Sequence, residues 1–284
     1  TPPGAPTGSA TERAQHGSRR SSSSPRLPRP QLHRLQRLCL RRSRHRHRPR
    51  PHPLRHLRHR PGRRCGIRPL PLSAITFARL GALSTRQHEP SGASRSFDRD
   101  RDGFVLSEGA AVLVLERGNH ARARGATAHG VVAGYGASAD VHHPVNPHPD
   151  GRGLQQAIRT ALADAALTPG DIDHVSAHAA STRAGDLAEA RALSHVFSST
   201  PPPVTALKSL LGHSLGAASA IQAACALLAL RHQAIPPTAN LDNQDDAIDL
   251  DIVRKAPRPA RLRTILTTAC GFGGANAALI LRGS

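Results

Sequence analysis

Residues 265–281 read Ile-Leu-Thr-Thr-Ala-Cys-Gly-Phe-Gly-Gly-Ala-Asn-Ala-Ala-Leu-Ile-Leu. The runs at 265–269 and 277–281 are short and apolar, which is typical of buried strands. Between them, residues 271–274 predict a tight bend, because glycine adopts backbone conformations that other residues avoid. The stretch therefore predicts two strands that flank a glycine-rich turn.

Strands and helices are predicted to alternate through the sequence before this stretch. Residues 111–115, Ala-Val-Leu-Val-Leu, form a continuous apolar run that is typical of a strand covered on both faces. Periodicity predicts further strands at 131–137 and 175–178, and helices at 154–167, 185–197 and 212–230. This alternation predicts an α/β layered domain.

The first quarter of the chain has a different composition. Up to Ile75 it holds 19 Arg and no Lys against a single acid, Glu12, so nearly all of the net charge of +20 lies there. Residues 1–71 also lack helical or strand periodicity. They cannot bury enough apolar surface to offset their chain entropy, so we expect them to be disordered. A basic arm that binds nucleic acid is the alternative, which the lack of interleaved aromatic residues disfavours.

The cysteines and the apolar runs suggest an ordinary intracellular protein. The four cysteines, Cys39, Cys65, Cys225 and Cys270, show no CxxC or other short paired spacing. They predict neither a disulfide framework nor a zinc site, and we expect no metal. We find no 18-residue apolar run and no apolar signal core, which predicts a soluble, cytoplasmic protein with reduced thiols.

Three segments place polar residues at the end of a predicted strand or the start of a predicted helix. They are residues 177–186, Ala-His-Ala-Ala-Ser-Thr-Arg-Ala-Gly-Asp; residues 208–218, Lys-Ser-Leu-Leu-Gly-His-Ser-Leu-Gly-Ala-Ala; and residues 270–276, Cys-Gly-Phe-Gly-Gly-Ala-Asn. Singly, each has a structural interpretation, such as a hydrogen-bonding histidine, a turn, or first-turn acids that complement a helix dipole. Only their combination indicates a reaction site.

In this order and spacing, the segments resemble the β-ketoacyl-acyl-carrier-protein synthases, condensing enzymes of the thiolase superfamily. Residues 97–110, Phe-Asp-Arg-Asp-Arg-Asp-Gly-Phe-Val-Leu-Ser-Glu-Gly-Ala, and residues 236–242, Pro-Pro-Thr-Ala-Asn-Leu-Asp, are similar to further blocks of that family. The resemblance covers residues 72–284, the C-terminal half of a synthase, and favours the fatty-acid elongation type. It implies a thiolase-like layered αβαβα fold that is incomplete here, with the second half and only the tail of the first.

The resemblance also implies a reaction and its partners. An acyl chain is carried as a thioester on a cysteine, and malonyl-acyl carrier protein then loses carbon dioxide and attacks that thioester in a decarboxylative Claisen condensation. The implied partners are acyl carrier protein, acyl and malonyl thioesters, and a second synthase subunit in a homodimer or heterodimer. No cofactor is implied beyond the phosphopantetheine arm of the carrier.

Individual residues acquire roles by the same resemblance. His178 and His213 are expected to hydrogen-bond the thioester oxygen through Nε2–H as neutral imidazoles. Lys208 corresponds to a lysine that orients one histidine. The backbone N–H of Phe272 corresponds to an oxyanion-hole donor, and its ring to a gate over the acyl channel. Supporting roles fall to Glu189, the acidic partner of the lysine, to Asp186, which we expect to be structural, and to Thr182.

Three positions depart from the pattern of the family. Ser107 replaces a usual glycine, Gln222 replaces a frequent glutamate, and Ala269-Cys270 replaces a common Asn-Ser. Neither Cys225 nor Cys270 lies in the context of the family's nucleophile. Cys225, midway along an apolar helix, is most simply a small core residue.

The family's nucleophilic cysteine is expected about 140 residues before the first histidine, which falls near Cys39. Its neighbours, Gln36-Arg37-Leu38 and Leu40-Arg41-Arg42, include arginines that could not enter a buried bend, so Cys39 is not expected to be the nucleophile. A frameshift explains the segment better. Shifted by one base, GC-rich codons from Gln36 accommodate Ser-Val-Ser-Ala-Cys-Ala-Gly, which is very similar to the family's bend.

Three functional hypotheses follow. The first is a β-ketoacyl synthase that is inactive in this form because it lacks the cysteine segment. The second keeps the fold without condensation, as in family members that lack the cysteine and act as chain-length or decarboxylating partners of an active subunit. The third, a basic nucleic-acid-binding protein, depends on the arginine-rich segment alone and predicts salt-dependent binding.

Overall fold

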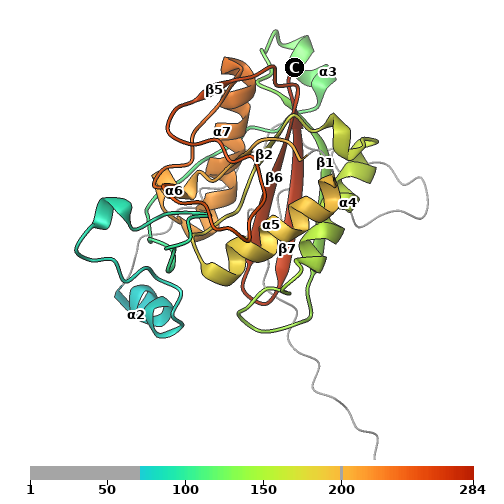
Figure 1. The fold of residues 1–284 in the computed structure, drawn as a ribbon. Helices are drawn as coiled ribbons and strands as arrows, with labels where there is room; N and C mark the ends of the chain where they lie inside the picture. Colours follow the sequence, from blue (N-terminus) through green and yellow to red (C-terminus); the bar gives the residue numbers. More distant parts are fainter. Residues whose placement is uncertain (1–70, 199–200) are drawn as a thin grey trace, which may run out of the picture. The chain divides into compact units, whose positions relative to one another are not determined.

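A five-stranded mixed sheet forms the centre of the computed structural model, which describes residues 71–198 and 201–284 (Figure 1). The strand order is β1-β7-β6-β2-β3. The first three pair antiparallel, whereas β2 pairs parallel with both β6 and β3. The bounds are β1 Val131–Ala139, β2 His174–Ser176, β3 Val204–Thr205, β6 Thr264–Gly271 and β7 Ala275–Arg282. The glycine-rich turn therefore joins β6 and β7 as a hairpin, and the predicted strands at 131–137, 175–178, 265–269 and 277–281 are confirmed.

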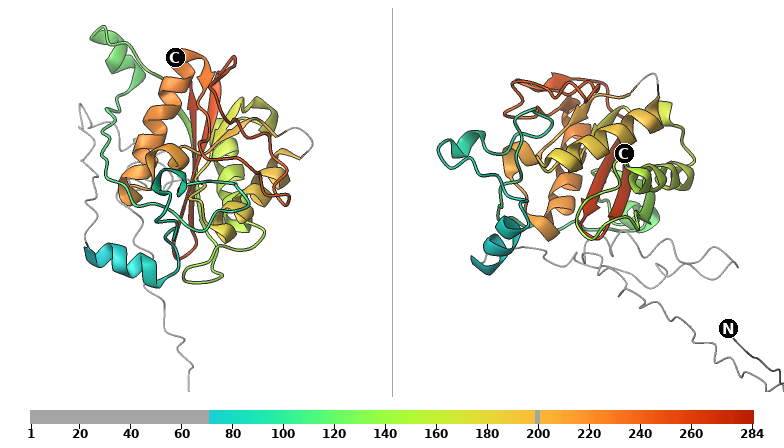
Figure 2. Two further views of the ribbon diagram at one scale, coloured as in Figure 1. Left: turned by 60° about the vertical axis from the view of Figure 1, so that its left-hand side comes forward. Right: turned by 60° about the horizontal axis from the view of Figure 1, so that its bottom comes forward.

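Helices cover both faces of the sheet, as Figures 1 and 2 show. On one face, α4 (Arg152–Ala165) and α5 (Arg183–Phe197) pack on Leu266 and Ile280. On the other face, α7 (Ala218–His232) packs on the neighbouring residues of the same strands, Ile265 and Leu281. Adjacent residues of a strand point to opposite faces, so each strand contributes to both cores. The predicted α/β layered class is confirmed.

The predicted strand at residues 111–115 is wrong. These residues form no strand in the described part of the chain, and Val112, Val114 and Leu115 are 47, 61 and 44% exposed. Leu113 alone turns inward, against the apolar cluster beside α7. An extended segment becomes a strand only when a neighbour pairs with its N–H and C=O groups, and no described strand pairs with this one. The run keeps the apolar character of a buried strand but lacks its neighbour.

The last predicted helix begins six residues later than expected, at Ala218 rather than residue 212. A short helix, α6 (Lys208–Leu211), ends at Gly212, whose φ of +67° interrupts the helix. The His213 N–H then donates to Val105 O at 2.7 Å, and a 3-10 turn, η4 (Leu215–Ala217), leads into α7. The chain is thus extended at His213 because a second segment binds its backbone.

One described segment, Leu215–His232, is long and apolar enough to cross a membrane by length and composition alone. Gln222, Arg231 and His232 lie within this segment, so it is not the continuous 18-residue apolar run whose absence the sequence predicted. Its buried side, 44% of the segment, packs on β6 and β7. The core helix of a water-soluble domain has the same properties.

Short elements complete the described chain. They are α2 Pro71–Arg79, η2 Pro90–Gly92, α3 Gly118–Ala123, η3 Pro169–Asp171, β4 Ala234–Ile235 and β5 Arg258–Pro259. The expectations about residues 1–70, including Cys39, lie outside the described residues. The division between residues 71 and 72 stays a prediction, although Pro71 is already the first residue of α2.

Candidate functional site

The structure brings His178 and His213 together. His178 follows β2, and His213 precedes η4, 35 positions later in the sequence. Their ring centroids are 5.4 Å apart with an interplanar angle of 82°. The first two segments singled out by the sequence thus meet at the carboxyl end of a parallel strand, where α/β sheets commonly bind ligands.

Glu189 anchors the backbone that carries His178. Its carboxylate accepts the N–H of His178 at 2.9 Å and the N–H of Ala179 at 2.7 Å, and the Thr268 hydroxyl donates to the same carboxylate. Ala179 and Ser181 both have positive φ, +21° and +67°, which costs energy for residues with a side chain. The buried carboxylate therefore holds a strained turn in place and fixes where the His178 ring begins.

Lys208 contacts the same histidine from α6. Its ammonium donates to the carbonyl oxygen of His178, and Nζ lies 3.4 Å from His178 Nδ1. Burial lowers the pKa of Lys208 to about 8, against the opposing effects of Glu189, Cys270 and Asp186. Burial, and then the charges of Lys208 and His213, hold the pKa of His178 well below 6.5. His178 is therefore neutral at neutral pH, and an Nδ1 that faces an ammonium accepts a hydrogen bond, which leaves the proton on Nε2.

His213 is held in the same tautomer by its own backbone. The Leu215 N–H donates to His213 Nδ1 at 3.2 Å, so the proton lies on Nε2 whenever the ring is neutral. The His213 N–H and C=O bind Val105 and Ser107, and the edge of the ring contacts Phe104 at a centroid distance of 5.1 Å. Two neighbouring imidazoles thus both have Nδ1 occupied, which directs the donor N–H of each ring to Nε2.

Phe272 lies at the tip of the β6–β7 hairpin and is 46% exposed. Its ring lies 6.0 Å from that of Phe77 in α2, which lies 5.4 Å from Phe104. A row of rings therefore connects Phe272 to His213 by way of Phe77 and Phe104. After Phe272 the chain needs glycine, since Gly273 and Gly274 have φ of +79° and +72°.

The Asp186 carboxylate and the Thr182 carbonyl accept hydrogen bonds from the block at residues 97–110. Asp186 is fully buried and accepts the Phe97 N–H at 2.9 Å, while Arg101 Nε lies 3.8 Å from the same oxygen. The Thr182 carbonyl accepts hydrogen bonds from the Asp186 N–H and from Arg101 Nε. Burial raises the pKa of Asp186 to about 7, although Phe97 and Arg101 oppose it. Both residues join the first segment to the block at residues 97–110, which agrees with a structural role.

The raised pKa of Asp186 predicts how stability depends on pH. Between pH 4 and pH 7 the folded chain keeps a proton that the unfolded chain has released, so the free energy of unfolding should fall as the pH rises through this window. Urea unfolding at several pH values should show that Asp186→Asn removes this slope. Asp171→Asn is the control, because the pKa of that exposed carboxyl is lowered and it is ionised throughout the window. A slope that persists in Asp186→Asn would contradict the prediction.

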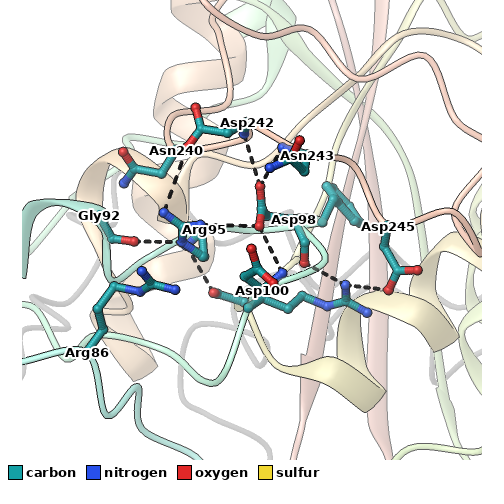
Figure 3. Close-up of polar contacts among 12 residues, drawn as sticks. Arg86, Gly92, Arg95, Asp98, Asp100, Asn240, Asp242, Asn243 and Asp245 are labelled. Atoms are coloured by element: carbon teal, nitrogen blue, oxygen red, sulfur yellow. Dashed lines mark hydrogen bonds and ion pairs between the residues drawn. The ribbon is translucent and has the colours of Figure 1, made fainter. Parts of the chain in front are cut away.

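Asp98 joins two sequence blocks beside the site (Figure 3). Its fully buried carboxylate accepts the backbone N–H groups of Asp100, Asp242 and Asn243 at 2.9–3.0 Å, and the Arg95 guanidinium lies 3.3 Å away. The block at 97–110 is thereby fixed to the block at 236–242. Both blocks carry the family resemblance, but their sequences alone did not predict that Asp98 links them. The signal was an aspartate beside a glycine-containing loop, which by itself suggests only a turn.

Thr268 and Gln222 were also missed as neighbours of His178. The Thr268 Oγ1 accepts the His178 N–H at 2.9 Å, and the Gln222 amide donates to the two carbonyls that precede His178. Both come from elements that pack against β2 only in three dimensions. Gln222 also borders a cavity of about 110 Å³ with Lys208, Ser107, Glu108 and Ser214.

The described cysteines do not have the environment of a nucleophile. Burial raises the pKa of the Cys225 thiol, and burial together with Glu189 raises that of Cys270 well above its usual range. A nucleophilic thiolate needs the opposite shift. In residues 71–198 and 201–284, no group of three or more His, Cys, Asp or Glu side chains is placed to hold a metal ion.

Comparison with known families gives two adjoining matches. Residues 68–121 match "Beta-ketoacyl synthase, N-terminal domain" and residues 129–242 match "Beta-ketoacyl synthase, C-terminal domain". The site residues from His178 to Gln222 therefore lie within the second match.

Individual proteins agree with the family matches. The chain is 46% identical over 213 residues to 3-oxoacyl-[acyl-carrier-protein] synthase 2 of Mycobacterium bovis, covering 75% of this chain and 51% of that protein. Among solved structures, the ishigamide ketosynthase/chain length factor has a TM-score of 0.73 and 39% identity, covering 78% of this chain and 53% of that one. A type II polyketide ketosynthase in complex with its acyl-carrier protein and bound to a hexaketide has a TM-score of 0.74 and 34% identity, covering 75% of this chain and 53% of that one. The chain thus spans about half the length of the relatives it matches.

Proposed function

The chain belongs to the β-ketoacyl synthase family and has the C-terminal half of its thiolase-like fold, and we propose that it forms the decarboxylating half of a condensing site. The observation that carries the proposal is the pair of adjacent imidazoles at His178 and His213, both with Nδ1 occupied. The reaction is the decarboxylative Claisen condensation of an acyl thioester with malonyl-acyl carrier protein, in fatty-acid or polyketide synthesis. The chain's enzyme class is acyltransferase.

The geometry supports a specific division of labour. When the malonyl carboxylate leaves as carbon dioxide, the electron pair of the broken C–C bond moves toward the thioester carbonyl oxygen as an enolate. Two Nε2–H donors stabilise that oxygen. The carbanion then attacks the acyl thioester carbonyl, and the cysteine thiolate leaves. The Phe272 N–H, at the hairpin tip, is the proposed donor to the oxyanion formed in this second step.

The described residues do not supply the cysteine, and they expose the surface on which a further layer fits. Apolar residues occur on every side of helix α7, with Leu228 51% exposed, and no described strand pairs with the run at residues 111–115. A helix apolar all round is typical of a position between two layers. We propose that the remainder of a synthase N-terminal domain covers this surface and brings the nucleophile to the two histidines.

We predict that the chain by itself does not condense acyl and malonyl thioesters. No described cysteine has an activated thiol, and the arginines around Cys39 do not suit a buried bend. Carbon–carbon bond formation would be measured with purified chain and both loaded carrier proteins, with an intact synthase as the positive control. Turnover that disappears in Cys39→Ala would contradict the prediction and make Cys39 the nucleophile.

A non-catalytic partner subunit is the second candidate. It is favoured by the likeness to the ishigamide ketosynthase/chain length factor, which pairs a catalyst with a chain-length subunit. Decarboxylation of malonyl-acyl carrier protein by the chain, once its missing domain is restored, separates the two. A chain-length subunit needs no donors aligned on an enolate, so His178 and His213 would then be dispensable.

The remaining assignments complete the proposal. We propose acyl carrier protein as the partner, a synthase dimer as the assembly, and the cytoplasm as the location. The only prosthetic group involved is the carrier's phosphopantetheine arm. Nucleic acid is not favoured, because it was suggested only by residues that lie outside the described part.

A further inference from the structure

The end of β2 is held by side chains at three successive carbonyl groups. Gln222, from α7, donates its side-chain amide to Ser176 O at 2.6 Å and to Ala177 O at 3.2 Å. The third carbonyl, that of His178, accepts the Lys208 ammonium. Both side chains are buried, at 5% and 6% exposure, and a buried carbonyl that loses its donor destabilises the fold. The position of His178 therefore depends on Gln222 as well as on the charged residues.

A neutral amide suits this arrangement, because its NH2 group donates to both carbonyls. A carboxylate at position 222 would place an acceptor oxygen against two carbonyl oxygens. The Gln222 amide would do the same if its oxygen and nitrogen exchanged places. Glutamate, which the family often has here, would be repelled by the end of β2 and attracted to Lys208 on the wall of the same 110 Å³ cavity. The choice of glutamine decides whether Lys208 has a competing anion in α7.

We propose that Gln222 is a positioning residue for His178. Its amide fixes the end of β2, and because it is uncharged it does not draw the Lys208 ammonium away from His178. The inference rests on the proposed function, because the position of His178 matters only if its ring acts on a thioester. Gln222 itself acts through His178 and Lys208 and touches neither the thioester nor the carrier.

The charges around Lys208 make the proposal measurable. The titratable groups that face it are Glu189 and Asp186 from α5, Cys270 from β6, His178 after β2, His213 beyond that ring, and Glu108 across the cavity. Despite these acids, burial keeps the pKa of Lys208 at about 8. A further carboxylate at position 222 would raise it and draw the ammonium away from His178 Nδ1. His178 would then become easier to protonate and lose its preference for the Nε2–H tautomer.

The test compares Gln222→Glu with Gln155→Glu in the full chain. Gln155 is the matched control because it is 7% exposed and its amide also donates to a backbone carbonyl, Asp150 O at 2.8 Å, but in α4. NMR titration of labelled lysine and histidine would follow Lys208 and the His178 ring nitrogens. Gln222→Glu should raise the pKa of Lys208 by at least one unit and raise that of His178. Gln155→Glu should change neither.

A second variant and the unmodified chain keep the test decisive. Gln222→Met removes both hydrogen bonds without adding charge, so it should leave the pKa of Lys208 within a few tenths of a unit while the His178 tautomers mix. Equal Lys208 titrations in Gln222→Glu and Gln155→Glu would overturn the proposal. So would an Nδ1–H tautomer of His178 in the unmodified chain, which needs no variant to fold. Neither measurement requires turnover. A restored synthase that fails to decarboxylate malonyl-acyl carrier protein would contradict the proposed function and leave this inference intact.

Discussion

Replacing His178 or His213 with alanine in a synthase restored with its N-terminal domain should slow malonyl decarboxylation by about 100- to 1000-fold. Each change removes one donor to the developing enolate oxygen, and the loss of one such donor typically has an effect of this size. Lys208 and the Leu215 N–H occupy Nδ1 of the two rings and favour the tautomer with the proton on Nε2. Each ring can then donate to the enolate oxygen. Release of carbon dioxide from labelled malonyl-acyl carrier protein measures the step directly.

Two controls separate this role from general damage to the site. His195→Ala removes an exposed histidine at the end of α5 and should leave the rate unchanged. Phe272→Ala should spare decarboxylation, because its backbone N–H remains. Acyl transfer to the cysteine should suffer less in His178→Ala, since thiolate formation depends more on the helix N-terminus that carries the cysteine. Normal decarboxylation in both histidine variants would disprove the assigned roles while leaving the family unaffected.

The strands of the described domain were predictable where their neighbours are present. The hairpin at residues 264–282 combines two apolar runs with glycines at positive φ, so local sequence and tertiary pairing agree. The run at residues 111–115 has an equally strong apolar signal but forms no strand. The apolar run predicts a strand that is buried in a complete sheet. Sequence periodicity does not show whether the strand that would pair with it is present.

The two histidines were predictable from motif order, but their surroundings were not. The resemblance placed His178, His213, Lys208 and Glu189 at one site, and the structure brings all four together. The hydrogen bonds from Gln222 to the two carbonyls before His178 depend on how α7 packs across β2. No local sequence pattern predicts that packing. The sequence showed only that Gln222 stands where the family often has glutamate. The structure gives a physical reason for glutamine, because its amide donates to Ser176 O and Ala177 O.

The start of α7 shows how tertiary backbone pairing overrides helix periodicity. Residues 212–217 continue the small, apolar pattern of the helix, and the sequence predicted them as helical. The backbone of His213 instead pairs with Val105 and Ser107, which holds the ring beside His178. A helical His213 would lose these contacts, so the segment that carries the candidate chemistry is where the prediction failed.

Removing the Asp98 carboxylate should destabilise the described domain more than any other change considered above. Asp98→Ala would leave three buried N–H groups without an acceptor and the Arg95 guanidinium, 8% exposed, without its closest carboxylate. Breaking a buried ion pair from one side costs about 3–5 kcal/mol. Urea unfolding at pH 7 should show a lower midpoint with an unchanged slope, because the exposed surface of the unfolded chain stays the same.

Asp100→Ala is the matched control for this measurement, because Asp100 belongs to the same block but is exposed. Surface changes of this kind usually stay within about 0.5 kcal/mol. Because Asp98 fixes the block at 97–110, and that block holds Val105 against His213, the lost stability should be accompanied by a change in the His213 ring signals. Equal midpoints for Asp98→Ala and Asp100→Ala would show that the carboxylate does not link the two blocks, and the position of His213 would then need another explanation.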